Sequence, residues 1–110
     1  MSFFQIVGKK GCIEVLYKIK DGINTFTLIK NKLDSEGLNL STRTLSERLS
    51  DLEREGLIKK IQNKYILTKK GEEALEIIEY IIEWEKRWEE VKLPKIIVSM
   101  LGDISSGENK

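Results

Sequence analysis

The chain has 110 residues, of which 40% are hydrophobic and 34% charged, and its formal net charge is +1. This length predicts one domain with a small hydrophobic core. With one cysteine and no histidine, the composition excludes an internal disulfide, a zinc site of clustered Cys and His, and histidine acid–base catalysis. The sequence shows neither a membrane-spanning apolar run nor a signal-peptide pattern, so we expect a soluble, cytoplasmic protein.

The first half of the chain predicts three helices. Apolar residues recur every three or four positions over residues 10–20, 25–34 and 41–55, the spacing that gives a helix one buried face. Gly22 suits the end of the first helix and Ser41 is a favourable N-cap for the third. The residues expected to face inward are Cys12, Ile13, Leu16, Ile19, Phe26, Ile29, Leu33, Leu45, Leu49 and Leu52.

The second half predicts a β-hairpin and a long helix. Two short strand-like runs, residues 57–61 and 64–67, surround the polar pair Gln62-Asn63. Thr68 can cap a helix that extends over residues 68–91. The expected fold is mainly α-helical with a small β-hairpin, a winged helix-turn-helix with a long C-terminal helix. We expect residues 1–92 to form this domain and residues 93–110 to add an apolar segment and a flexible tail.

Charge is divided along the chain. Residues 9–70 contain fourteen Lys and Arg against eight Asp and Glu, whereas residues 71–92 contain three against eight. This division predicts a basic surface for a polyanion and a separate acidic element. Ordinary solvated charge is the alternative interpretation.

The polar outer face of the third helix predicts contacts with duplex DNA. Arg43 suits a two-pronged contact with guanine, whereas Arg48 and Arg54, on the flanks, suit phosphates. The predicted DNA-binding residues of this helix are Thr42, Arg43, Thr44, Ser46, Glu47, Arg48, Ser50 and Arg54. The alternative is a solvated face with pairs such as Arg43 and Glu47 at i,i+4.

The hairpin predicts a second DNA contact. Lys59, Lys60, Asn63 and Lys64 surround its turn, where they can meet flanking phosphates or the minor groove. Solubilising charge on a sheet edge is the alternative. For four further lysines, solvated charge is a simpler interpretation than phosphate contact; these are Lys9, Lys10, Lys30 and Lys32.

The long helix has the apolar spacing of a coiled-coil seam and predicts a homodimer. The residues of this predicted interface are Ile77, Ile81, Trp84, Trp88 and Val91. The two tryptophans could instead form a platform for a ligand, but at helical spacing within an apolar stripe the domain core or the dimer interface is the simpler interpretation. Cys12 is interpreted as a small buried residue. The glutamates have no convergent partners and no Gly-rich phosphate loop is present, so we expect neither an enzyme nor a cofactor.

Five segments carry a family pattern: Val7-Gly8-Lys9-Lys10, Ile13-Glu14-Val15-Leu16, Leu45-Ser46-Glu47-Arg48-Leu49, Leu52 to Ile58 and Tyr65 to Gly71. Together they resemble HxlR-type regulators, and MarR-type regulators share some of these motifs. The resemblance spans roughly residues 7–90 and implies a homodimeric transcriptional regulator of a pseudo-palindromic site. It also implies that helix 41–55 reads the DNA and that residues 59–64 form the wing.

The chain departs from the HxlR pattern at three places. The usual Cys-Pro near the start is absent and Cys12 lies inside the first helix, so a thiol-sensing mechanism does not carry over. Gly11 stands where that family has a tryptophan, and the connection over residues 34–40 is longer than usual. The leading hypothesis is sequence-specific binding of double-stranded DNA. The alternative is a winged-helix module for protein–protein contact, in which the acidic helix docks a partner.

Overall fold

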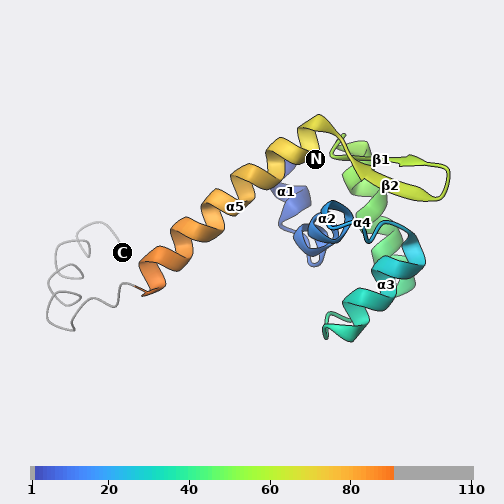
Figure 1. Ribbon diagram of the computed structural model, residues 1–110, viewed down its shortest axis with the longest axis horizontal. Coiled ribbons are helices and arrows are strands. Elements are labelled where there is room, and N and C mark those ends of the chain that lie inside the picture. Colours follow the sequence, from blue (N-terminus) through green and yellow to red (C-terminus); the bar gives the residue numbers. More distant parts are fainter. Residues whose placement is uncertain (1, 91–110) are drawn as a thin grey trace, which may run out of the picture. The chain divides into compact units, whose positions relative to one another are not determined.

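The computed structural model describes residues 2–90 as a series of helices and one hairpin. In chain order the elements are α1 (Phe3–Val7), α2 (Cys12–Lys20), α3 (Phe26–Ser35), α4 (Thr42–Arg54), β1 (Ile58–Ile61), β2 (Lys64–Leu67) and α5 (Lys69–Glu90) (Figure 1). The chain divides into two compact units, Met1–Ile78 and Glu79–Lys110, and α5 contributes to both. Within residues 2–90, no helix is long and apolar enough to cross a membrane.

Side-chain caps begin α3 and α4, and the cap of α4 is the predicted Ser41. The Thr25 hydroxyl accepts a hydrogen bond from the amide of Leu28 at 3.2 Å, and the Ser41 hydroxyl accepts one from the amide of Thr44 at 3.0 Å. Each bond satisfies an amide that has no partner within the first turn. The predicted helices over 25–34 and 41–55 are therefore confirmed to within a residue at each end.

The start of the chain differs from the prediction. A separate short helix, α1, precedes the predicted first helix, and α2 begins at Cys12 rather than at Lys10. Ser2 and Gln5 form a capping box for α1, with bonds of 2.8 and 3.3 Å. Gly11 then separates the helices with a φ of +92°, and a Cβ there would lie 2.6 Å from Leu40 Cδ1. The start of α2 is therefore determined by the left-handed conformation of Gly11, and the prediction of a helix from Lys10 was two residues too early.

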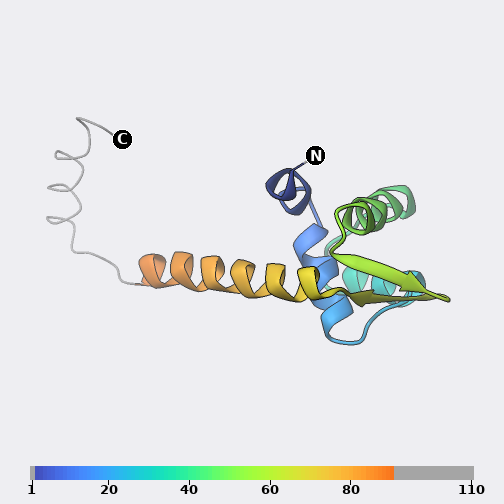
Figure 2. The ribbon, with the colours of Figure 1, turned by 90° about the horizontal axis from the view of Figure 1, so that it is seen from above.

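The strands β1 and β2 pair in antiparallel register from Ile58 opposite Leu67 to Ile61 opposite Lys64. The turn residue Gln62 has a φ of +57°, in the left-handed region. The backbone amide of Tyr65 donates to the carbonyl oxygen of Asn24 at 2.8 Å, which joins β2 to the segment before α3. Figure 2 shows the turn of this hairpin extending beyond the helices of the first unit, as Figure 1 does.

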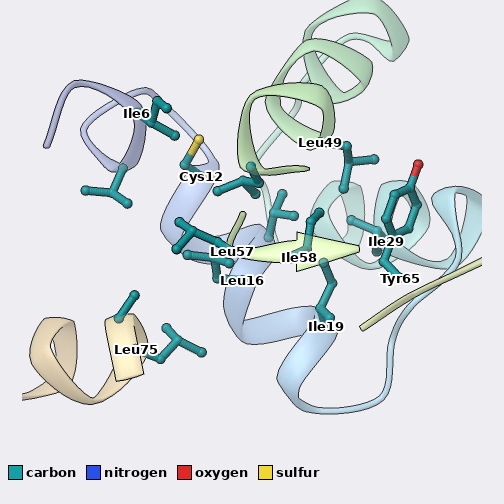
Figure 3. Close-up of a cluster of buried hydrophobic side chains, with 14 of the residues drawn as sticks. Ile6, Cys12, Leu16, Ile19, Ile29, Leu49, Leu57, Ile58, Tyr65 and Leu75 are labelled. Carbon is teal, nitrogen blue, oxygen red and sulfur yellow. The ribbon is translucent and has the colours of Figure 1, made fainter. Parts of the chain in front are cut away.

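One hydrophobic core, drawn in Figure 3, joins all the elements of the first unit. Of the residues predicted to face inward, all are buried except Ile13 and Phe26, which are partly buried against the same core. The hairpin adds Ile58 and Tyr65, and the first part of α5 adds Ala74, Leu75 and Ile78. The observed architecture confirms the predicted mainly α-helical winged helix-turn-helix with a small hairpin.

The start of α5 is fixed against the connection between α4 and β1. The Thr68 amide donates to the Leu57 carbonyl oxygen at 3.0 Å, and the Thr68 hydroxyl caps the helix by accepting from the Gly71 amide at 3.0 Å. A Cβ at Gly71 would lie only 2.0 Å from the Leu57 carbonyl oxygen. Only glycine permits this backbone approach.

Candidate nucleic-acid interface

The outer face of α4 is polar and open to solvent. Over its first three turns the exposed side chains are Thr42, Arg43, Ser46, Glu47 and Ser50. The Arg43 side chain is 88% exposed, and its Nε lies 3.2 Å from Glu47 Oε2. The i,i+4 pair that a solvated face predicts is therefore present. It leaves the guanidinium at the surface, where a ligand can reach it.

Thr44, half-buried in the first turn, belongs partly to the cap of α4. Its hydroxyl accepts a hydrogen bond of 3.0 Å from the Ser41 hydroxyl, and its amide is bound to that same oxygen. This predicted DNA-binding residue thus has a structural role already.

Arg48 and Arg54, the two predicted phosphate contacts of α4, have partners within the protein. Arg48 Nε donates to the carbonyl oxygen of Lys10 at 3.0 Å, which ties the middle of α4 to the loop between α1 and α2. Arg54 Nη1 donates to Asp51 Oδ1 at 3.0 Å, yet its side chain remains 69% exposed. Arg54 therefore retains more access to an external phosphate than Arg48, which is half-buried.

A buried carboxylate anchors the inner side of α4. Asp51 is only 6% exposed, and Lys9 Nζ lies 2.8 Å from its Oδ2. The hydrogen bond from Lys9 lowers the pKa of Asp51, with help from Arg54 and against the opposing effect of burial. Lys9, for which phosphate contact was the less favoured interpretation, is thus the ion-pair partner of Asp51. Sequence reasoning missed Asp51, because no local pattern marks a pair 42 residues apart.

The wing presents its four predicted DNA-binding side chains at the surface. Lys59, Lys60, Asn63 and Lys64 are all exposed, and the turn that they surround projects beyond the helices (Figure 2). Lys60 Nζ lies 5.5 Å from the centre of the Tyr65 ring. Of the other weakly predicted lysines, Lys30 pairs with Asp34 at 2.7 Å.

Cys12 is completely buried, as predicted for a small core residue. Burial raises the pKa of its thiol to about 11, despite the opposing influence of Arg48. The thiol is therefore protonated near neutral pH and lacks the reactive thiolate that a redox sensor requires. Among the described residues no cluster of acidic, Cys or His side chains could hold a metal ion.

The apolar side chains of the predicted dimer interface are exposed along α5. Ile77 is 55%, Ile81 45%, Trp84 49% and Trp88 59% exposed. Val91, the last member of the set, lies outside the described residues. Trp84 and Trp88 therefore lie outside the buried core of the described residues, and their place in a dimer interface stays a prediction.

Comparison with known proteins gives matches over most of the chain. The winged helix-turn-helix family matches residues 9–86. An uncharacterized HTH-type transcriptional regulator of Methanocaldococcus jannaschii is 64% identical over 103 residues, which cover 94% of this chain and 97% of that protein. The uncharacterized HTH-type transcriptional regulator YvaP of Bacillus subtilis is 32% identical over 90 residues, which cover 76% and 80%.

A solved structure supports the fold independently. The quinone-bound YodB from B. subtilis matches with a TM-score of 0.66 and 24% identity, covering 76% of this chain and 91% of that one. Both similar sequences are named as regulators and neither as an enzyme, in agreement with the prediction of a non-enzymatic protein. From its sequence and its fold, the chain belongs to the winged helix-turn-helix family.

Proposed function

We propose that the protein is a homodimeric transcriptional regulator that binds specific sequences in double-stranded DNA. In this proposal α4 enters the major groove and residues 59–64 contact the flanking backbone. The observation that carries it is the exposed polar face of α4 beside a projecting basic hairpin. The names of the two similar proteins, both HTH-type transcriptional regulators, support the same function.

In the proposed complex Arg43 gives up its ion pair with Glu47 and contacts a guanine instead. Its pair with Glu47 is solvent-exposed, and such an i,i+4 pair contributes only about 0.3–0.5 kcal/mol. A two-pronged contact with guanine discriminates by about 1–3 kcal/mol. Breaking the surface pair therefore costs less than the base contact gains. Glu47, once released, is free to accept from a base amino group.

The second copy is proposed to dock on α5. Ile77, Ile81, Trp84 and Trp88 are exposed at the spacing of a coiled-coil seam, which Val91 extends. A two-fold dimer would present two α4 helices to half-sites about 34 Å apart, or a multiple of that distance. Residues 1–92 then form the binding and dimerising domain, to which residues 93–110 are an addition.

Fluorescence anisotropy with labelled duplexes tests the DNA contact. One duplex comes from the region upstream of the protein's own gene and the other is a scrambled version, and both are titrated over a salt series. We expect affinity that falls steeply with salt, and Arg43→Ala should lower it about 5- to 100-fold on the upstream duplex only. Lys86→Ala removes an exposed charge from α5 and should leave both affinities unchanged.

Two outcomes would contradict this assignment. Equal losses on both duplexes with Arg43→Ala would leave that residue a phosphate contact only. Absence of wild-type binding at low salt would favour the protein-interaction module, to which the exposed apolar and acidic α5 is suited.

Light scattering at micromolar concentration tests the dimer. We expect twice the monomer mass for the wild type and the monomer mass for Ile81→Glu, because a charge would be buried without a partner in the seam. A monomeric wild type would refute dimerisation through α5.

A further inference from the structure

We propose that a phosphate of the DNA backbone binds in a pocket between the N-terminus of α3 and the wing. This inference rests on the proposed DNA-binding function and adds a contact from an element outside α4. It assigns a role to Thr27 and Tyr65, which were not among the predicted DNA-binding residues.

The pocket has a volume of about 320 Å³. Its lining combines the first residues of α3 with the hairpin; the residues are Thr25, Phe26, Thr27, Lys60, Asn63 and Tyr65. Several of these groups donate hydrogen bonds and one is a cation, whereas none of the described lining residues carries a carboxylate. The lining chemistry therefore suits an anion that has several acceptor oxygens.

The α3 side of the pocket supplies free backbone donors. The first backbone hydrogen bond of this helix is donated by the Ile29 amide to the Thr25 carbonyl oxygen. The Leu28 amide donates to the Thr25 hydroxyl. Within residues 2–90, the amides of Phe26 and Thr27 have no acceptor. No acidic side chain occupies the first turn. The positive end of the helix dipole is therefore not neutralised and favours an anion there.

The hairpin side supplies the hydroxyl of a buried tyrosine, and this hydroxyl has no partner among the described residues. Tyr65 is 7% exposed, yet its phenol oxygen has no hydrogen bond to any described residue. Buried phenols normally have such a bond, so this one indicates a missing ligand. The bond from the Tyr65 amide to Asn24 fixes the ring beside the start of α3. Figure 3 shows the hydroxyl at the end of the ring that points away from Ile19 and Ile58.

Lys60 brings a positive charge to the same place. It is the register partner of Tyr65 across the hairpin, and its Nζ lies 5.5 Å from the centre of the tyrosine ring. Since Lys60 is exposed, its flexible side chain can reach the same phosphate as the Tyr65 hydroxyl and the α3 amides. A backbone phosphate next to the groove occupied by α4 supplies that anion.

Isosteric substitutions test the pocket with the same anisotropy assay. Tyr65→Phe removes only the hydroxyl, and we expect it to weaken binding to both the upstream and the scrambled duplex by the same factor of about 5–10. Its melting temperature should not fall, because the lost group has no partner in the free protein. Lys60→Gln should lower the slope of log affinity against log salt by about 1. Tyr80→Phe, at an exposed tyrosine of α5, is the matched control and should bind as the wild type does.

The outcomes separate this proposal from the broader one. If the wild type binds duplex DNA with steep salt dependence but Tyr65→Phe binds equally well, the pocket assignment is overturned and the regulator remains. If no duplex binds at all, both fail. An NMR titration with inorganic phosphate adds a second arm. Shifts of the Phe26 and Thr27 amides that Lys60→Gln abolishes, without any effect of the variants on DNA affinity, would indicate a free-anion site and overturn the DNA contact.

Discussion

Two amphipathic helices of this protein cover their apolar faces in different ways. α4 buries Leu45, Leu49 and Leu52 to 2% exposure or less. α5 buries Leu75 and Ile78, but beyond Ile78 its tryptophans are about half exposed. Helical spacing thus predicts which side chains share a face, but not whether the same chain covers it. The open apolar face of α5 is the feature on which the proposed dimer rests.

The sharpest test of this comparison sets Leu49→Ala against Trp88→Ala. Leu49→Ala leaves a cavity in the core and should cost about 2–5 kcal/mol at any protein concentration. At about 4–8 °C per kcal/mol, thermal melts would detect this cost easily. Trp88→Ala should leave the monomer stable and lower the melting temperature only where the wild type is dimeric. An equal, concentration-independent loss for both variants would mean that Trp88 packs within its own chain.

The inner anchor of α4 gives a smaller effect that depends on pH. Asp51→Asn weakens the bonds from Lys9 and Arg54 and should cost about 1.5–3 kcal/mol near pH 7. Because the folded-state pKa of Asp51 is lowered, its contribution is complete above the unfolded pKa of about 3.9. It is lost as the pH falls through the lowered folded-state pKa.

Urea titrations of wild type and variant across this acid range measure the difference in the free energy of unfolding. Glu53→Gln, at an exposed position of α4, serves as the control and should show little difference. If the difference in the free energy of unfolding between Asp51→Asn and the wild type stays constant as the pH falls, the effect comes from packing rather than from charge.

The smallest expected effect is a stabilisation at the turn of the wing. Gln62 has a φ of +57°, which an L-residue adopts at a cost that glycine avoids. Gln62→Gly should therefore raise the stability by about 0.5 kcal/mol after the extra freedom of the unfolded chain is subtracted. Asn63→Gly, at a position without a positive φ, should lower it. Calorimetry on both variants tests this, and a fall for Gln62→Gly would show that the glutamine side chain contributes more than its backbone costs.

Local signals predicted most of the fold. The inward spacing of α2, α3 and α4, the caps Ser41 and Thr68, and the strand–turn–strand pattern all act over a few residues, and the structure follows them. The helix α1 was missed, because five residues are too few for a period, although its capping box was visible as Ser2 and Gln5. The left-handed turn at Gln62 also lacked a signal, since glycine is usual in that conformation.

The candidate site was only partly predictable. Periodicity identified the exposed face of α4 correctly, because a residue opposite a buried stripe faces solvent. It did not identify the internal partners of Arg48, Arg54 and Lys9, since these contacts depend on how separate segments pack. The phenol of Tyr65 is a further example, because its missing partner becomes apparent only when the neighbours of the side chain are known.

The contact between Gly71 and Leu57 has a mechanical consequence. One residue, Thr68, separates the end of β2 from the start of α5, and the carbonyl of Leu57 touches the first turn of that helix where a side chain would otherwise stand. Because Gly71 has no side chain to separate the two backbones, a tilt of the first turn of α5 displaces Leu57 and the start of β1 directly. We therefore expect this connection to be rigid, so that the start of β1, the end of β2 and the first turn of α5 move together.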